Sequence, residues 1–183
     1  MTRHVSYLLA LAFFLPVPVL SQTEQQYINI GLLLPDRSYS HIIQAAELAI
    51  EEANMAGAYN NQEFRLLVRT AEGFWGAGSK ESVSLVYEDN VRAIVGHLDG
   101  RNGHLAEQVA TKSHLSYIET FATEPTLSQA FVPWFMRVVP NDNQQSLVII
   151  ERIQMEGGGK ICILSTESYD TKYAVRSLTK AVA

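Results

Sequence analysis

Short apolar runs alternate with longer amphipathic segments along most of the chain. Unbroken or alternating apolar runs predict strands, whereas apolar residues spaced three and four positions apart predict helices. By this criterion the strands lie at 27–34, 63–70, 91–96 and 115–118, with an extended run at 134–139 and a further strand at 160–165. The predicted helices are 41–57, 79–90, 102–112, 143–156 and 168–182.

Two of the predicted helices have an apolar face that the sequence identifies. In 41–57 the side chains that share one face are Ile42, Ala46, Ala49 and Ala53. Gly57 is expected to end this helix. In 79–90 the side chains expected to point inward are Val83, Val86 and Tyr87.

Strands that alternate with helices in this way predict right-handed crossovers and a parallel sheet covered by helices on both faces. The predicted fold class is therefore α/β. Ligands of such sheets bind beyond the carboxyl ends of the strands, where the connecting loops meet. The loops expected at that edge are 35–40, 71–78, 97–103 and 119–128.

The amino-terminal segment has the pattern of a secretory signal peptide. An uncharged apolar run, 5–20, follows a basic start at Arg3 and precedes Ser21. The run contains two prolines and is shorter than the roughly 20 residues that a membrane-spanning helix needs, which favours cleavage over a retained anchor. We therefore expect 1–21 to be removed on export, a chain that begins near Gln22, and no stable membrane insertion.

Acidic residues outnumber basic ones, 19 against 14, and the net charge is −5. No basic stripe interleaved with aromatic residues occurs, so nucleic acid is not an expected partner. The single cysteine, Cys162, has no partner for an internal disulfide. Its position within the predicted strand 160–165 indicates a buried, inert thiol.

The sequence lacks the motifs of the common enzyme classes. The turn after the first predicted strand, 31–35, lacks the glycine spacing that a dinucleotide requires, and neither a phosphate loop nor a nucleophile elbow occurs. His97, Asp99 and His104 lack the further carboxylate or thiolate that would complete a metal site. We therefore expect no catalysis, no cofactor and no bound metal.

Four segments carry a resemblance to a known family. They are 30–34 with the Ala-rich helix that follows, 93–98 (AIVGHL), 121–127 (FATEPTL) and 135–142 (FMRVVPND). In order and spacing they resemble the type I periplasmic binding proteins, and among these the leucine/isoleucine/valine-binding transport receptors. The resemblance implies two α/β lobes joined by crossovers, in which 22–140 forms the first lobe and 141–183 begins a second, truncated lobe.

In that family a ligand carboxylate is held by a hydroxyl after the third strand and by a small-residue, threonine-containing loop after the fourth. A helix amino terminus suits a carboxylate because its backbone N–H groups are unpaired and its dipole is positive. Thr123 matches the family threonine, and Tyr169 matches a tyrosine that faces the ligand from the second lobe. Gly100 replaces a usual serine and Phe121 a usual small residue, so a donor is lost and part of the cleft is filled. The ligand-binding residues implied by the resemblance are Asp99, Gly100, Arg101, Phe121, Ala122, Thr123 and Tyr169.

Most of these residues also have a simpler structural interpretation. Thr123 would hydrogen-bond only within its own loop, and Phe121 would fill the core beneath that loop. Tyr169 would pack on the hinge as the first residue of a helix. Asp99 and Arg101 would form an ion pair in a solvated turn. The sequence leaves these alternatives open.

The resemblance implies an extracytoplasmic solute-binding protein of the periplasm that captures a small amino-acid-like or carboxylate-bearing solute. An inner-membrane ABC transporter permease would then receive the solute. The alternative is a ligand-sensing or accessory receptor domain of the same fold that takes part in signalling. If 141–183 is only the start of a lobe, helix 143–156 should expose an apolar face in this chain.

Overall fold

The computed structural model describes residues 27–73, 76–129 and 131–182. The predicted signal peptide, 1–21, lies outside the described residues. The strands within them are β1 (Ile28–Leu34), β2 (Phe64–Thr70), β3 (Ala93–Gly96), β4 (Ser116–Glu119) and β5 (Phe135–Arg137). The helices are α1 (Ser40–Met55), α2 (Ala77–Tyr87), α3 (Gly100–Ser113), α4 (Asp142–Met155) and α5 (Tyr169–Val182), with a 3-10 helix, η1, at Pro125–Ser128.

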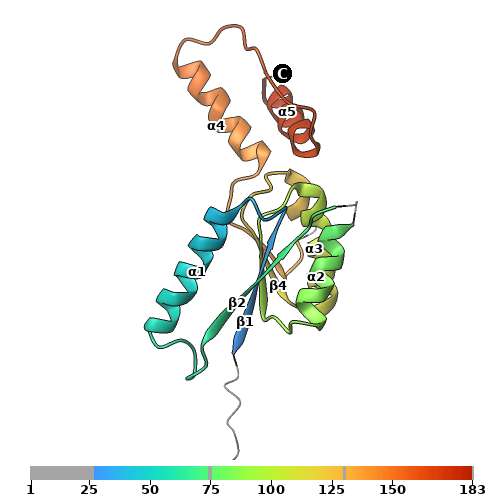
Figure 1. The fold of residues 1–183 in the computed structure, drawn as a ribbon. Coiled ribbons are helices and arrows are strands. Elements are labelled where there is room, and N and C mark those ends of the chain that lie inside the picture. The colour runs from blue at the N-terminus through green and yellow to red at the C-terminus, as the bar shows by residue number, and fades with distance from the viewer. Residues whose placement is uncertain (1–26, 74–75, 130, 183) are drawn as a thin grey trace, which may run out of the picture.

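The strands form one parallel sheet in the order β2-β1-β3-β4-β5. Near its centre, Leu32 of β1 is in register with Val68 of β2 on one side and with Val95 of β3 on the other. Figure 1 shows α1 on one face of the sheet and α2 and α3 on the other. The predicted α/β class, a parallel sheet with helices on both faces, is therefore confirmed.

The main hydrophobic core lies between the sheet and helices α2 and α3. Its strand residues include Leu33, Ile94 and Tyr117, which are fully buried. Burial of each large apolar side chain of this kind contributes about 1.5 to 3 kcal/mol to stability. The other buried members of the core are Leu85, Val91, Leu98, Ala106 and Ala110.

The inward face of α2 differs from the predicted one. Of the three side chains expected to point inward, Val83 and Tyr87 are exposed, and only Val86 packs against the core. Small residues take the inward positions because α2 lies close to α3: a Cβ atom on Gly78 would come within 2.9 Å of the Asn102 side chain. The buried residues of α2 are Gly78, Ser82, Ser84 and Leu85.

Helix α1 lies on its face of the sheet without another described helix beside it, and none of its residues is fully buried. Of the predicted apolar face, Ile42, Ala46 and Ala53 are partly buried, whereas Ala49 is exposed. The helix ends just before Gly57, whose φ of 105° is the left-handed conformation that favours glycine after a helix.

Helices α4 and α5 pack against each other beyond the carboxyl ends of the strands (Figure 1). A capping box begins α4: the Asn141 side chain accepts from the Gln144 backbone, and the Gln144 side chain accepts from the Asn141 backbone. On α4 the apolar side chains of Leu147, Val148 and Ile149 are 65%, 66% and 46% exposed, as predicted for this helix. The predicted boundary between two lobes stays a prediction.

The prediction of a strand at 160–165 is wrong, because the segment between α4 and α5 forms no strand. Its apolar side chains are exposed, Leu164 at 94%, and Cys162 is an exposed free cysteine where a buried one was expected. A strand requires a neighbour to which its backbone can hydrogen-bond, and none of the described strands pairs with this segment. Apolar composition alone therefore did not determine the local structure here.

Candidate functional site

The first turn of α3 faces the first turn of α5. Asp99 caps α3, and its side chain accepts a 2.8 Å hydrogen bond from the backbone N–H of Asn102. The backbone N–H of Gly100 donates to Oδ1 of Asp170 over 2.8 Å. The amino terminus of α3 therefore binds a carboxylate that the chain itself supplies, as the positive end of a helix dipole favours.

Arg101 and Tyr169 make a second contact between the same two turns. The guanidinium carbon of Arg101 lies 4.9 Å from the centroid of the Tyr169 ring, which is a cation–π geometry. The Tyr169 ring lies 5.2 Å from the ring of Tyr173, one turn further along α5. Asp99 thus caps a helix while Arg101 contacts an aromatic ring, in place of the ion pair considered between them.

Asp170 lies among other acidic groups. Burial raises the pKa of Asp170, the N–H of Gly100 lowers it, and the negative charges of Asp99, Glu124 and Asp142 raise it further. The net direction is upward. Mild acid therefore protonates Asp170 more readily than an exposed aspartate and weakens its bond to Gly100.

Crowding explains why residue 100 is glycine. A Cβ atom on Gly100 would collide with a carboxylate oxygen of Glu124 and would lie 2.7 Å from Oδ1 of Asp170. The serine expected from the resemblance does not fit beside these two side chains without movement. The absence of the serine hydroxyl is therefore explained by two acidic side chains, Glu124 and Asp170, whose positions the sequence alone does not reveal.

A buried carboxylate, Glu119, organises the loop after β4. Its Oε1 accepts hydrogen bonds from the backbone N–H groups of Thr120, Phe121 and Ala122 at 3.0, 2.8 and 3.2 Å. Its Oε2 accepts from the buried hydroxyl of Tyr117 at 2.5 Å. Four donors satisfy this carboxylate, so the loop with the predicted site residues is held in a defined conformation.

The three predicted residues of this loop occupy different environments. Phe121 is 49% exposed, and its ring lies 4.7 Å from the ring of His97, so it is not a core residue beneath the loop. Ala122 is buried. Thr123 lies beside the start of α4, where its carbonyl accepts from the N–H of Asp142 at 2.8 Å, and its side chain lowers the pKa of the Asp142 carboxyl.

The predicted ligand-binding residues therefore fall into two groups. The group at the meeting of α3 and α5 consists of Asp99, Gly100, Arg101 and Tyr169. The group on the loop after β4 consists of Phe121, Ala122 and Thr123. Glu124 links the two groups, because it follows Thr123 in the chain and its side chain reaches Gly100.

Sequence reasoning missed several charged residues of this region. Glu124 is fully buried, and its carboxylate contacts His104 while its carbonyl accepts a 2.7 Å bond from Arg137. Burial lowers the pKa of Arg137, although the charges of Glu119, Asp142 and Glu124 oppose that shift. A charged residue within an apolar run, such as Arg137, was the available signal, since burial of a charge requires partners nearby.

Comparison with known proteins identifies the family. A model of the receptor family ligand binding region matches residues 41–182. The chain belongs to this family. A relative, glutamate receptor 3.7 of Arabidopsis thaliana, is 29% identical over 138 residues, which are 72% of this chain and 14% of that receptor.

Solved structures share the fold of this ligand binding region. An ABC transporter substrate-binding protein from Desulfitobacterium hafniense in complex with Leu is 17% identical with a TM-score of 0.75, over 85% of this chain and 47% of that one. A solute binding protein of an ABC transporter from Rhodopseudomonas palustris in complex with 3,4-dihydroxy benzoic acid is 16% identical with a TM-score of 0.73, over 86% and 44%. The predicted type I periplasmic-binding fold is confirmed, and the chain spans less than half the length of these proteins.

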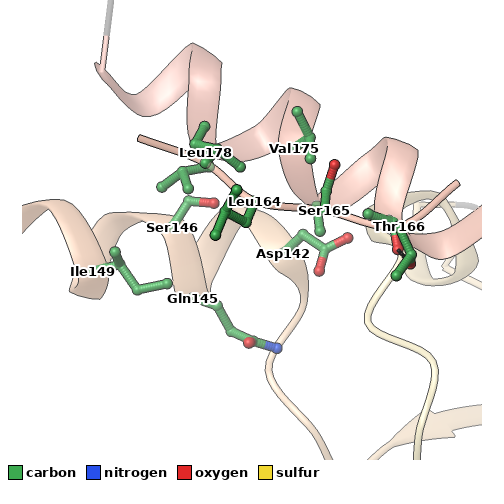
Figure 2. Close-up of a pocket in the computed structure, with 12 residues that line it drawn as sticks. Asp142, Gln145, Ser146, Ile149, Leu164, Ser165, Thr166, Val175 and Leu178 are labelled. Carbon is green, nitrogen blue, oxygen red and sulfur yellow. Dashed lines mark hydrogen bonds between the residues drawn. The ribbon is translucent and has the colours of Figure 1, made fainter. Parts of the chain in front are cut away.

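The ligand binding region also contains a cavity of about 580 Å³ between α4, the segment before α5, and α5 itself (Figure 2). Ile149, Leu164 and Leu178 contribute apolar surface, and Asp142 contributes a carboxylate. Oδ2 of Asp142 has no hydrogen-bond partner among the described residues, and burial raises the pKa of Asp142. None of the seven predicted ligand-binding residues lines this cavity.

Within the described ranges, 27–73, 76–129 and 131–182, no helix is both long and apolar enough to cross a membrane. No group of three or more His, Cys, Asp or Glu side chains in the same ranges is arranged to hold a metal ion.

Proposed function

We propose that this ligand binding region captures a small, carboxylate-bearing or amino-acid-like solute outside the cytoplasm, at the carboxyl edge of its sheet. The observation that carries the proposal is the hydrogen bond from the Gly100 N–H to the Asp170 carboxylate. A helix amino terminus that binds a carboxylate of the protein itself offers an N–H donor that has no partner within the helix, and the positive end of the helix dipole. A ligand carboxylate needs the same two features. The ligand carboxylate would take the place of Asp170.

The surrounding side chains suit the rest of such a ligand. Thr123 would add a hydroxyl donor, and Phe121 and Tyr169 would add apolar contact. The acidic groups Glu124 and Asp170 near Gly100 favour a ligand that also carries an ammonium group, because an adjacent positive charge offsets their repulsion. An amino acid combines both charged groups, which is why the amino-acid-like class leads this proposal.

Delivery of the solute to an inner-membrane ABC permease from the periplasm is the first downstream role in this proposal. The fold is that of substrate-binding proteins, among them one in complex with Leu. A second candidate is the ligand-sensing region of a receptor, which the 29% identity to a plant glutamate receptor favours. Sequencing the transcript beyond Ala183 separates them: membrane helices followed by a signalling module would favour the receptor, and a stop after a second lobe would favour import.

The binding proposal is tested on the protein expressed from its whole transcript, with whatever sequence follows Ala183. A thermal-shift screen against amino acids, small acids, amides and aromatic acids identifies a ligand by stabilisation of the fold. If no carboxylate in the screen raises the unfolding temperature, the proposed function is wrong.

Thr123→Val should then weaken binding of that ligand. Loss of one charge-assisted hydrogen bond costs about 1.5 to 3 kcal/mol, which is roughly a tenfold to hundredfold loss of affinity by isothermal titration calorimetry. Because the Thr123 side chain also favours the charged form of the Asp142 carboxyl, the variant should unfold at a lower temperature, so affinities are compared where both proteins are folded. Thr123→Ser keeps the hydroxyl and is the matched control. Parent-like affinity of a folded Thr123→Val protein would rule out the carboxylate assignment.

A further inference from the structure

Three rings from separate loops meet where β1, β3 and β4 end. Tyr39, His97 and Phe121 form this aromatic cluster, with His97 in the middle. The Tyr39 ring meets the His97 ring edge-on at 5.5 Å, and the Phe121 ring lies 4.7 Å from it. These separations are within the range of favourable aromatic pairs. The cluster lies at the edge of the sheet where ligands of parallel sheets bind.

The hydrogen bonds around His97 determine which ring nitrogen carries the proton. The hydroxyl of Thr120 has one proton, and it donates that proton to the carbonyl of Gly96 at 2.8 Å. Thr120 Oγ1 also lies 3.0 Å from Nδ1 of His97. Because the hydroxyl proton is already used, Nδ1–H of His97 must donate to Thr120. A neutral His97 therefore carries its lone pair on Nε2.

Nε2 of His97 is an acceptor without a partner among the described residues. Burial lowers the pKa of His97, and the nearby His41 lowers it further. The imidazole is therefore neutral at neutral pH, and its free nitrogen accepts a hydrogen bond. The ring of Phe121, which contacts the His97 ring, is half-exposed and offers apolar surface to a ligand.

We propose that the aromatic cluster selects a ligand whose aromatic ring carries a hydrogen-bond donor, with the donor bonded to Nε2 of His97 and the ring packed on Phe121 and Tyr39. This inference rests on the proposed function, because it assigns the ligand class of the same carboxyl edge. A ligand that covers the cluster without a donor leaves the acceptor unpaired and desolvated, which weakens its binding. A tyrosine-like ligand should therefore bind better than a phenylalanine-like one.

L-tyrosine and L-phenylalanine test this inference, because they differ by one hydroxyl. Calorimetry on the protein from its whole transcript should show L-tyrosine binding about three- to tenfold more tightly. His97→Phe keeps a ring but removes the acceptor, so the preference should disappear: L-tyrosine should lose affinity, and L-phenylalanine should gain it because it no longer covers an unpaired acceptor. His114→Asn is the control, since it removes an exposed histidine at the carboxyl end of α3, away from the cluster, and should retain the preference.

A second measurement, made on the parent protein, does not depend on how the variants fold. Nitrogen-15 NMR of the parent imidazole should show Nδ1 protonated and Nε2 bare, and Nε2 should shift when L-tyrosine is added. In Thr120→Val the acceptor for Nδ1–H is gone, so both tautomers should appear and the preference for L-tyrosine should fall.

The outcomes separate this inference from the proposed function. Equal affinity for L-tyrosine and L-phenylalanine, or binding of L-leucine alone, would overturn the inference and leave carboxylate capture standing. A proton on Nε2 in the free parent protein would also overturn it. If no amino acid or other carboxylate binds, the proposed function fails and the inference fails with it.

Discussion

Two histidines near the carboxyl edge of the sheet have pKa values shifted in opposite directions, because their neighbours differ. Burial lowers the pKa of His97, and the nearby His41 lowers it further. Glu107 raises the pKa of His104; burial opposes that effect, and Glu124 adds to the rise. Near neutral pH, His97 is therefore neutral, whereas His104 retains positive charge to a higher pH than usual.

His104→Gln should remove a stabilisation that depends on pH. Because the folded pKa of His104 is raised above its ordinary value of 6.5, the contribution is fully present below pH 6.5 and is lost as the pH rises through the folded pKa. The parent should exceed the variant in free energy of unfolding most at about pH 5.5 and least at about pH 9, measured by urea unfolding. His41→Gln, at an exposed position, is the control. A gap that widens with pH would contradict this assignment.

At single residues, the sequence did not reveal contacts between distant positions. Thr123 and Tyr169 were assigned to the ligand by the resemblance, and that assignment stays a prediction. Asp170 was missed, because its bond to Gly100 joins positions 70 residues apart in the sequence. Glu119 was missed for another reason: three of its four donors are backbone groups, which no side-chain pattern reveals.

Between elements, close approach decides which residues fit. Gly96 of β3 lies against Tyr117 of β4, and a Cβ atom on Gly96 would overlap the Tyr117 ring and hydroxyl. Tyr117 has little freedom to move, since it is fully buried and bonded to Glu119. The Tyr117 side chain therefore packs directly on the backbone of Gly96, where no residue with a side chain fits without movement.

Gly96→Ala should destabilise the fold by about 1 to 3 kcal/mol, the usual cost of overpacking a core. Gly103→Ala is the matched control, because a Cβ there would meet Leu127 at an ordinary 3.4 Å. Alanine also favours the helical conformation of α3, so this control should be neutral or up to about 1 kcal/mol more stable. Chemical denaturation of both variants measures the difference, and equal stabilities would refute the packing argument.

Element types followed from the alternation of apolar patterns, but two details did not. The inward face of α2 was predicted wrongly because large apolar residues were expected to point inward. The inward positions instead hold small residues, Gly78 and Ser82, because α3 lies close to α2. The segment 160–165 was predicted as a strand from its composition, yet it has no strand beside it to pair with. Both errors concern neighbours in space.

For the whole molecule, the α/β class, the parallel sheet and the family resemblance were all predictable from the sequence. The sequence did not show how much apolar surface α4 and the segment before α5 expose. Leu147 and Val148 of α4 and Leu164 before α5 are each more than 60% exposed. Apolar surface of this kind favours association with a partner or with a second copy.

The 183-residue chain expressed alone should therefore self-associate. Light scattering after size-exclusion chromatography should report species larger than the monomer, and increasingly so with concentration. Replacing Leu147 and Val148 together by Gln should shift the distribution toward the monomer without altering α4, because both side chains are exposed. Leu48→Gln and Met55→Gln, at exposed positions of α1, are the controls. A parent chain that stays monomeric, unfolds cooperatively and binds a small solute tightly would contradict this expectation.

The crowding around Gly100 imposes an order on any route, evolutionary or engineered, toward a serine at that position. Gly100→Ser made first would set a new side chain against Glu124 and Asp170. Asp170→Gly made first would clear one of these obstacles and free the Gly100 N–H, after which the serine has more room. The two substitutions are therefore epistatic, since the effect of each depends on whether the other is already present. The closer of the two obstacles, the Glu124 carboxylate, remains after the change at position 170, so a route through that position also requires Glu124 to move.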